Sequence, residues 1–207
     1  MDGTLLDGEV LEIIAKEAGV ERQVKEITDL AMYGQLEFKE AIKRRLELLS
    51  DFPLYKVEQI ADNFPLVPGT EELIKWLKKE NYRIGIITGG FEEVAAKIAQ
   101  RLGADFFMAN QWEIKNNKLT GRFNLKVNNN KDLLLKKAKE LYGARVTIAV
   151  GDGANDIPML KSADIGIAFC AKPKVNNIIP LQVKEKNLLK IKEIIENNQL
   201  TRKIYKQ

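Results

Sequence analysis

Short apolar runs alternate with helical patterns after residue 68, and this alternation constrains the fold more than any other feature of the sequence. The runs Arg83–Thr88, Val146–Val150 and Ile165–Ala168 have the composition of buried strands. Helical patterns over Glu92–Leu102 and Lys131–Tyr142 stand between them. Strands that alternate with helices in this way form parallel sheets with helices on both faces. The sequence therefore predicts a doubly wound, Rossmann-like α/β domain, whose ligands bind beyond the carboxyl ends of its strands.

A hairpin and a final helix complete the elements expected in this domain. A short strand is expected over Phe106–Ala109, and a hairpin over Trp112–Lys115 and Lys118–Gly121. Asn116-Asn117 would form its turn. A surface helix is expected over Leu188–Asn198.

The stretch before residue 68 shows helical patterns and no strand pattern. Apolar residues recur at helical spacing in four successive segments, and Gly19 and Gly34 are expected to end the first two. Four short amphipathic helices predict a small helical bundle, inserted as a cap over residues 9–67. The core domain would then comprise residues 1–8 and 68–207, with Pro68-Gly69 as the link.

The composition limits the possible chemistry and the possible partners. The 207 residues include no histidine, which excludes serine–histidine and cysteine–histidine nucleophilic sites and histidine-bound zinc. Cys170 is the single cysteine; it cannot form an intrachain disulfide, and we expect it to be a small buried residue in a cytoplasmic protein. No apolar run approaches the roughly 18 residues of a membrane span. The 33 Lys and Arg residues, which give a net charge of +4, are scattered among 29 acidic residues. We therefore expect neither nucleic acid nor a membrane as partner. A small-molecule substrate, and a monomer or homodimer, are expected as well.

The motif Gly151-Asp152-Gly153-Ala154-Asn155-Asp156 directly follows one of the predicted strands. Its carboxylate and amide oxygens are hard ligands of the kind that Mg²⁺ prefers. Asp152, at the end of a buried strand, is the expected metal ligand, and Asp156 is expected in the second shell of the metal. Asp156 also has a purely structural interpretation, as the N-cap of a helix that has proline in its first turn.

Two further features point to an anion. Thr88-Gly89-Gly90 places a hydroxyl and two glycines between a strand and a helix, so that free backbone N–H groups and the positive end of the helix can bind phosphate. Lys131 stands where a helix is expected to begin, a place where a cation opposes the helix dipole. Lys131 is expected to steady a phosphoryl group, and an ordinary solvated lysine is the alternative.

The first residues, Met1-Asp2-Gly3-Thr4-Leu5-Leu6-Asp7, complete a set of motifs. They resemble the later part of the pattern Asp-x-Asp-Gly-Thr-Leu. With Thr88-Gly89-Gly90, Lys131 and the 151–156 motif in this order, the chain is similar to the haloacid-dehalogenase-like hydrolases. In that superfamily the first aspartate attacks phosphorus and the second acts as general acid and then as general base. The resemblance implies an aspartyl-phosphate intermediate, with Asp2 as the acid and base and its backbone carbonyl as a ligand of Mg²⁺.

Within this superfamily the helical insertion resembles the phosphoserine phosphatase family. The stretches 31–38 and 168–173 carry this resemblance together with Gly89-Gly90-Phe91. In that family a Glu, a Met, a Phe and an Arg surround the substrate serine. The matching positions are Glu9, Met32, Phe38 and Arg45.

The spacing of the third helical segment supports one of these positions independently. Arg45 lies on the apolar stripe with Ile42 and Leu49, whereas the neighbouring Arg44 does not. An inward guanidinium either extends past the edge of the core or binds an anion, for which a carboxylate is the best bidentate partner. Met32 and Phe38 are equally compatible with ordinary core positions.

The resemblance implies a Mg²⁺-dependent phosphoserine phosphatase that catalyses the final step of serine biosynthesis. Thr88, Gly89 and Asn155 would contact the phosphoryl group, and Lys131 would neutralise it. A phosphatase of another small phosphomonoester and a catalytically dead phosphate-binding protein are the alternatives.

The chain departs from the family pattern at one place. The expected nucleophile, and the apolar strand before it, would stand directly before Met1. A start codon assigned too late is the expected explanation, followed by a truncated fragment. The chain as given is expected to be inactive.

Overall fold

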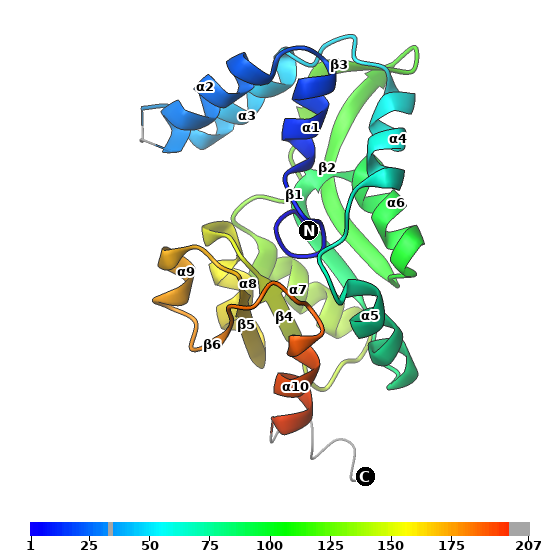
Figure 1. The fold of residues 1–207 in the computed structure, drawn as a ribbon, viewed down its shortest axis with the longest axis vertical. Helices are drawn as coiled ribbons and strands as arrows, with labels where there is room; N and C mark the ends of the chain where they lie inside the picture. The colour runs from blue at the N-terminus through cyan, green and yellow to red at the C-terminus, as the bar shows by residue number, and fades with distance from the viewer. Residues whose placement is uncertain (33–34, 199–207) are drawn as a thin grey trace.

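The computed structural model describes residues 1–32 and 35–198, in which a run of helices is followed by a part where strands and helices are interleaved (Figure 1). The α-helices of this part are α1 (Val10–Glu17), α2 (Glu21–Met32), α3 (Phe38–Glu47), α4 (Leu54–Asn63), α5 (Thr70–Lys79), α6 (Glu92–Leu102), α7 (Lys131–Leu141), α8 (Ile157–Ser162), α9 (Pro173–Asn176) and α10 (Lys190–Asn197). The strands are β1 (Gly85–Phe91), β2 (Phe106–Lys115), β3 (Lys118–Asn124), β4 (Ile148–Gly151), β5 (Ile165–Phe169) and β6 (Leu181–Val183).

Helices α1 to α4 lie at one end of the molecule and follow the four predicted helical segments (Figure 1). Val10, Ile14 and Ala15 form the buried side of α1. The helix stops before Gly19, whose φ of +72° glycine adopts without steric cost. Gly34, the second expected helix end, lies outside the described residues.

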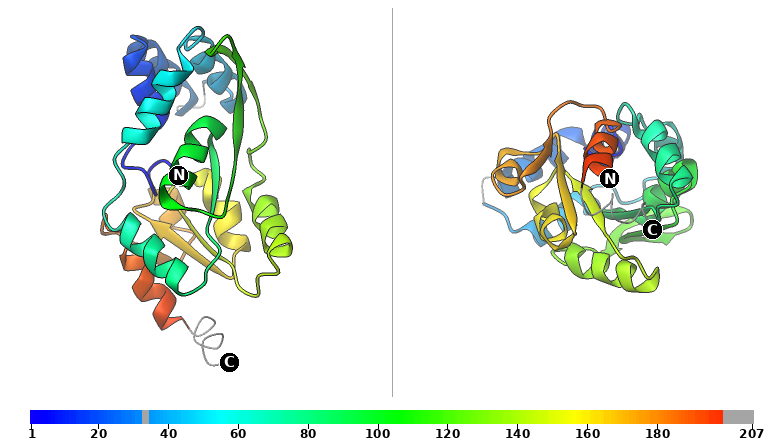
Figure 2. Two further views of the ribbon diagram at one scale, coloured as in Figure 1. Left: turned by 90° about the vertical axis from the view of Figure 1, so that its right-hand side faces the viewer. Right: turned by 90° about the horizontal axis from the view of Figure 1, so that it is seen from below.

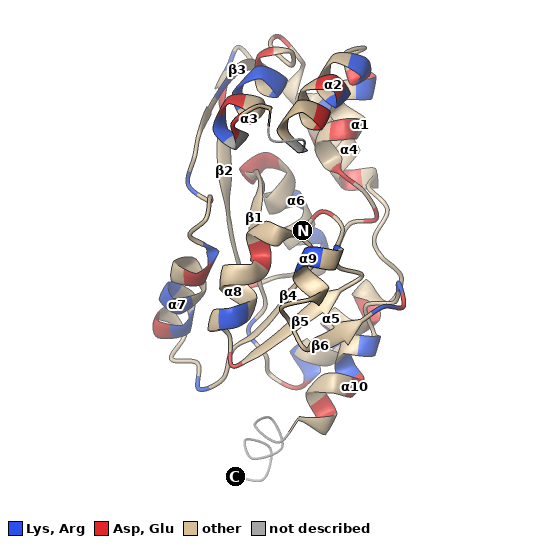
Figure 3. Ribbon diagram, turned by 90° about the vertical axis from the view of Figure 1, so that its left-hand side faces the viewer, with Lys and Arg blue, Asp and Glu red and all other residues tan. Residues whose placement is uncertain are grey.

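The outer sides of α2 and α3 carry charges of both signs (Figure 3). Arg22 pairs with Glu26 and Arg44 with Glu40, each one helical turn apart. Such exposed pairs contribute only a few tenths of a kcal/mol each, so the packing of the apolar sides decides where these helices lie. None of the helices described by the structure is long and apolar enough to cross a membrane.

Two three-stranded sheets, β1–β2–β3 and β4–β5–β6, form the centre of the fold. β1 pairs with β2 in parallel, and β5 lies parallel to both β4 and β6. β3 returns antiparallel to β2. The turn between them contains Asn116 and Asn117 with φ of +52° and +58°, which a tight two-residue hairpin requires and asparagine tolerates. The predicted α/β class and the predicted hairpin are confirmed.

Helices cover both faces of the sheet β4–β5–β6 (Figure 2). Ile165, Ile167 and Phe169 of β5 point to one side, where they pack with side chains of α5 and α10. Ala168 points to the other side and packs with side chains of α8. Because successive side chains of a strand alternate between faces, an entirely apolar strand such as β5 needs cover on both sides.

Some strand boundaries differ from the prediction. β1 starts two residues later than expected and continues through both glycines to Phe91. The predicted strand 106–109 and the first hairpin strand are one continuous strand, β2, because Asn110 between them is extended and buried. α9 and β6 were not predicted, because they are only four and three residues long and are too short to show a period.

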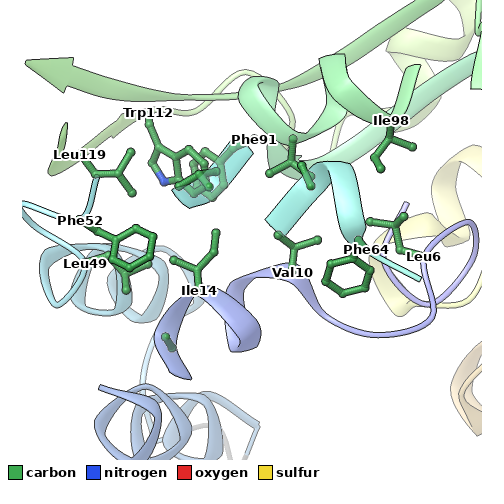
Figure 4. Close-up of a cluster of buried hydrophobic side chains, with 14 of the residues drawn as sticks. Leu6, Val10, Ile14, Leu49, Phe52, Phe64, Phe91, Ile98, Trp112 and Leu119 are labelled. Carbon is green, nitrogen blue, oxygen red and sulfur yellow. The ribbon is translucent and has the colours of Figure 1, made fainter. Parts of the chain in front are cut away.

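A buried cluster joins α1 and α4 to β1, β2 and α6 (Figure 4). Within it Phe91 stacks on Trp112 with ring centroids 4.1 Å apart. Leu6, from the N-terminal loop, is fully buried in the same cluster. The backbone N–H of Val67 donates to the carbonyl of Leu5. The loop of residues 1–8 is thus held at the place where the chain leaves the helical segment.

Candidate active site

The carboxyl ends of β1 and β4 meet at the N-terminal loop. Gly3 has φ of +68°, and a Cβ atom there would lie 2.8 Å from Oδ2 of Asp152. A Cβ atom on Gly90 would lie 3.2 Å from Cε of Met1. Only glycine fits at position 3, since both the conformation and the space exclude a side chain. The loop therefore touches both strand ends, as expected for a site beyond the carboxyl edge of a sheet.

Asp2 brings a buried carboxylate to this place. The backbone N–H of Val10, the first residue of α1, donates to it. The Oδ1 atom of Asp2, however, is buried and has no hydrogen-bond partner. Burial raises the pKa of Asp2, and the charge of Asp152 adds to this effect, against the lowering influence of the Met1 α-amino group. Asp2 thus offers an unused acceptor oxygen and holds its proton more readily than an exposed aspartate does.

Asp152, which directly follows β4, lies beside Asp2. The hydroxyl of Thr4 donates to Asp152 Oδ1 over 2.8 Å, and Thr4 itself is buried. The backbone N–H of Lys172 donates to the carbonyl of Asp152 over 3.1 Å. Thr4 orients this carboxylate, a role that the sequence analysis did not assign. The spacing along the chain gave no signal, because the two residues are 148 positions apart.

Lys131 and Asp156 form a buried ion pair. The Nζ of Lys131 lies 2.6 Å from Asp156 Oδ1, and the two side chains are only 4% and 10% exposed. Asp156 Oδ2 also accepts from the backbone N–H groups of Asp152 and Gly153, at 3.2 and 3.1 Å. Burial opposes ionisation of Asp156, but the charge and hydrogen bond of Lys131 outweigh it, and the pKa of Asp156 is lowered. The buried pair therefore fixes both the lysine and the loop that carries Asp152.

The structure contradicts the two alternative interpretations given above for Lys131 and Asp156. Lys131 is not an ordinary solvated lysine, because only 3% of the residue is exposed. Asp156 is not a side-chain N-cap of α8: it makes no capping hydrogen bond there and instead turns back to Asp152 and Gly153. Both side chains face the site because the loop between β4 and α8 places the Asp156 carboxylate over the start of α7, where Lys131 lies.

Thr88, Gly89 and Gly90 form the other side of the site. Thr88 is buried, and its Oγ1 accepts from the N–H of Gly90 over 2.9 Å. That N–H is therefore not free, contrary to the expectation that both glycines would offer free N–H groups to an anion. A Cβ atom on Gly89 would meet only Nδ2 of Asn155, at 4.0 Å. Asn155, from the 151–156 loop, thus lies opposite the Gly89 backbone.

Asn110, which the sequence analysis did not single out, holds this side of the site. It is 1% exposed. Its Nδ2 donates to the carbonyl of Gly89 over 2.9 Å, and its Oδ1 accepts from the N–H groups of Lys126 and Val127, both at 2.8 Å. One side chain therefore links the Thr88–Gly90 turn to the segment that leads into Lys131. A polar amide at the end of an apolar run was the only signal in the sequence.

Replacing Asn110 with alanine is expected to lower the free energy of unfolding by about 3 kcal/mol, because one buried and two partly buried backbone groups lose their partner. Urea unfolding followed by circular dichroism measures this. The exposed Asn129 provides the matched control: Asn129→Ala should change stability by less than about 0.5 kcal/mol. Equal effects of the two substitutions would show that the Asn110 bonds contribute nothing.

Glu9 lies near the carboxylates of the site, and Arg45 lies near Glu9 with the opposite charge. Glu9 directly precedes α1 and retains access to solvent. Partial desolvation by the surrounding protein raises the pKa of Glu9, and the negative charges of Asp2 and Asp152 raise it further. Arg45, on α3, is half-buried; burial lowers its pKa, while the charges of Glu9 and Glu12 act in the opposite direction. The two side chains are thus close enough to interact electrostatically.

The remaining predicted positions differ in what the structure says of them. Arg44 is exposed and pairs with Glu40, whereas Arg45 Nε donates to the carbonyl of Ala41 over 3.3 Å. The side chains of Met32 and Phe38 lie outside the described residues. The expectation of a buried cysteine is wrong, because Cys170 is exposed. It follows β5 with φ of +43°, so its side chain leaves the core where the strand ends.

Comparison with known proteins finds relatives over most of the chain. Residues 1–164 match the family model of the haloacid dehalogenase-like hydrolases. The chain is 40% identical to a phosphoserine phosphatase of Methanocaldococcus jannaschii over 94% of each chain. It is 37% identical to one of Lactococcus lactis, over 95% of this chain and 93% of the relative.

Solved structures agree with these relatives. The fold matches a substrate-bound phosphoserine phosphatase complex with a TM-score of 0.85 and 40% identity, over 94% of both chains. A structure described as a phospho-aspartyl intermediate analogue of phosphoserine phosphatase gives the same TM-score and identity, over 94% of this chain and 95% of that one. The chain belongs to the phosphoserine phosphatase family of the haloacid dehalogenase-like hydrolases.

Proposed function

We propose that this enzyme hydrolyses O-phosphoserine to serine and phosphate, the final step of serine biosynthesis. The observation that carries the proposal is the convergence of Asp2, Asp152 and the buried Lys131–Asp156 pair at the ends of β1 and β4. Such a group of carboxylates beside a fixed cation suits phosphoryl transfer, which depends on positioning and charge neutralisation. The names of the relatives in the family support the choice of substrate.

The phosphoryl group would lie between Thr88 and the 151–156 loop. The Thr88 hydroxyl and the Gly89 backbone would contact its oxygens from one side, and Asn155 from the other. Lys131 would neutralise its charge. Asp156 holds Lys131 in place within a buried environment, through the 2.6 Å contact.

The residues present fit a magnesium ion. Asp2 offers a buried oxygen without a partner, Oδ1, and Asp152 places a second carboxylate beside it. These are hard oxygen donors, although the described residues contain no group of three or more His, Cys, Asp or Glu that could hold a metal. Asp152 and the backbone carbonyl of Asp2 would hold the ion, with Asp156 in its second shell. When bound, Mg²⁺ would supply positive charge that orients the phosphoryl oxygens.

Magnesium is accordingly expected to stabilise the metal-free chain by about 2.7 kcal/mol at one hundred times its dissociation constant. Differential scanning calorimetry, with and without MgCl₂, measures the shift in melting temperature. Asp152→Asn should abolish the shift, because a neutral amide replaces the carboxylate that would hold the ion. Asp29→Asn, an exposed substitution on α2, should leave it unchanged. A shift that survives Asp152→Asn would place the ion elsewhere.

The chemical steps would follow the two-aspartate scheme. A carboxylate on the residue directly before Met1 attacks phosphorus, and the bond from phosphorus to the serine Oγ breaks. Asp2 donates a proton to the departing Oγ. Asp2 then takes a proton from a water molecule, whose oxygen attacks phosphorus and displaces the aspartate to release phosphate. The raised pKa of Asp2 suits a group that must carry a proton in one step and release it in another.

The position of the Met1 α-amino group supports this assignment of the nucleophile. Its charge lowers the pKa of both Asp2 and Asp156, so the start of the chain lies beside the proposed metal and phosphate sites. A preceding residue would project into the same space.

Residues 9–67 are proposed to form a cap that selects the substrate. Glu9 would bind the ammonium group of phosphoserine and Arg45 its carboxylate, with Met32 and Phe38 as apolar walls. The influence of Glu9 on the pKa of Arg45 supports placing the two ends of an amino acid between them. Because Glu9 lies beside the core carboxylates and also interacts with Arg45, the cap would sit over the phosphoryl site.

Phosphate release from O-phosphoserine, O-phosphothreonine and an aryl phosphate tests the proposed function, measured on the chain extended by the proposed nucleophile. A clear preference for O-phosphoserine is expected. Equal turnover of all three would indicate a phosphatase with another substrate. Binding without any turnover would indicate a phosphate-binding protein.

A further inference from the structure

Strand β1 loses its register with β2 just before its carboxyl end. The two strands pair at Ile87 with Met108, and again at Phe91 with Asn110. Between these two pairs β1 has more residues than β2, so β1 bulges there. Bulges next to active sites interrupt a ladder and redirect the groups that they carry. At this bulge the side chain of Asn110 donates to the carbonyl of Gly89 over 2.9 Å, in place of a ladder bond.

The amide of Asn110 has only one orientation that satisfies its surroundings. Its Oδ1 accepts from the backbone N–H groups of Lys126 and Val127, both over 2.8 Å, while its Nδ2 donates to Gly89. A flipped amide would place its NH₂ group against two donors and its oxygen against a carbonyl. Because Asn110 is only 1% exposed, water does not compete for these bonds. The side chain therefore accepts on one side and donates to the bulge on the other.

The peptide bond between Gly89 and Gly90 carries this polarity onward. In a trans peptide the C=O and N–H groups point in opposite directions. The carbonyl of Gly89 is held by Asn110, and the N–H of Gly90 donates to Oγ1 of Thr88 over 2.9 Å. Two successive glycines would otherwise leave this peptide free to rotate. The two hydrogen bonds fix its plane from both ends.

This arrangement decides what the Thr88 hydroxyl can do. A hydroxyl has one hydrogen to donate and lone pairs that accept. Because Oγ1 accepts from Gly90, the hydrogen of the hydroxyl cannot point at Gly90 and is directed elsewhere. Phosphoryl oxygens are strong acceptors, so they need a donor of this kind. Thr88, which is 4% exposed, is thus oriented as a donor.

We propose that Asn110 is a positioning residue for phosphoryl binding, which acts through the Gly89–Gly90 peptide to hold the Thr88 hydroxyl as a donor to a phosphoryl oxygen. The inference rests on the proposed function, which places the phosphoryl group beside Thr88. Asn110 does not touch the phosphoryl group itself. Every bond in the chain donates in the same direction, from the segment before Lys131 toward the site, so each bond strengthens the next.

A double-mutant cycle tests this, with inorganic phosphate as the probe and isothermal titration calorimetry of the 207-residue chain in the presence of MgCl₂. Thr88→Val removes the hydroxyl and keeps a similar shape; it should weaken phosphate binding about tenfold, because a hydrogen bond to a charged group is lost. Asn110→Ala should weaken binding by a similar factor. When Thr88→Val is already present, Asn110→Ala should weaken it by less than about twofold, since the hydroxyl through which Asn110 acts is gone.

Two further variants complete the cycle. Thr88→Ser keeps a hydroxyl, so Asn110→Ala should retain its full effect in that background. Asn129→Ala, a substitution of an exposed asparagine, should leave phosphate binding unchanged.

A spectroscopic measurement on the unmodified chain covers the case in which Asn110→Ala does not fold. When phosphate binds, the backbone N–H signal of Gly90 and the side-chain NH₂ signal of Asn110 should both move downfield in the ¹H–¹⁵N NMR spectrum, because the bonds of a chain polarise one another. In Thr88→Val the Asn110 signal should stay in place. Signals of Gly90 and Asn110 that do not respond to bound phosphate in the unmodified chain would overturn the proposal.

The outcome of the cycle is separate from the choice of substrate, because phosphate is common to every phosphomonoester. If Asn110→Ala costs the same affinity with and without the Thr88 hydroxyl, Asn110 only supports the fold and the proposal is wrong, while a preference for O-phosphoserine would still stand. If the losses are not additive but another phosphomonoester is preferred, the proposal stands and the assignment of the substrate fails.

Discussion

Extending the chain by an apolar strand of about five residues that ends in aspartate, directly before Met1, is expected to raise the rate of O-phosphoserine hydrolysis by on the order of 10⁴-fold or more. Two causes contribute. The strand would fill a cavity of about 240 Å³ between β1 and β4 and pair the facing edges of these two strands. The aspartate would stand next to Asp2, Asp152 and Lys131, where a nucleophile must be to attack a phosphoryl group held by Thr88. Phosphate release under saturating substrate measures the rate.

Two matched extensions separate these causes. The same strand ending in asparagine should stabilise the protein equally and remain inactive, because it restores the packing without the nucleophile. A strand interrupted by proline should restore neither. If the asparagine and aspartate forms hydrolyse O-phosphoserine at equal rates, the proposed covalent route is wrong, whatever the gain in stability.

The second large effect is expected at the cap. In the extended, active chain, Arg45→Ala should lower kcat/KM for O-phosphoserine by about 10³-fold, since a substrate carboxylate loses its charged, half-buried partner. Turnover of an aryl phosphate, which has no carboxylate or ammonium group, should change little. Steady-state kinetics with both substrates give the ratio that tests this.

Arg44 provides the matched control on the same helix. It is exposed and pairs with Glu40 along α3. Arg44→Ala should therefore leave both substrates unaffected. A similar loss with both substrates in Arg45→Ala would mean that this residue supports the structure of the cap and does not read the amino-acid part of the substrate.

The period of apolar residues predicted most of the elements in this protein. The helical segments of residues 9–67 and the alternation after residue 68 were found because each must bury one side, and burial leaves a period in the sequence. The prediction was wrong where local polarity was misleading. The expected short strand ends at Ala109, yet β2 continues through Asn110 because the amide of Asn110 is satisfied by Gly89, Lys126 and Val127.

The sequence by itself determined which chemical groups this protein can use. It offers carboxylates, hydroxyls, lysine and backbone N–H groups, and no histidine. Because Thr88 and Asp152 stand at the ends of predicted strands, the sequence also determined that these groups would lie at one edge of a sheet. Local spacing could go no further, because it reports only which face of an element is apolar.

Only the tertiary structure decided how those groups interact. Thr4 meets Asp152 across 148 positions, and Lys131 is buried against Asp156 across 25. Hydrogen bonds and ion pairs between distant segments leave no period in a sequence, so neither the burial of Lys131 nor the orphaned oxygen of Asp2 could be inferred from it. The cavity between β1 and β4 could not be inferred from the sequence either, since an unpaired strand edge exists only once the sheets have formed.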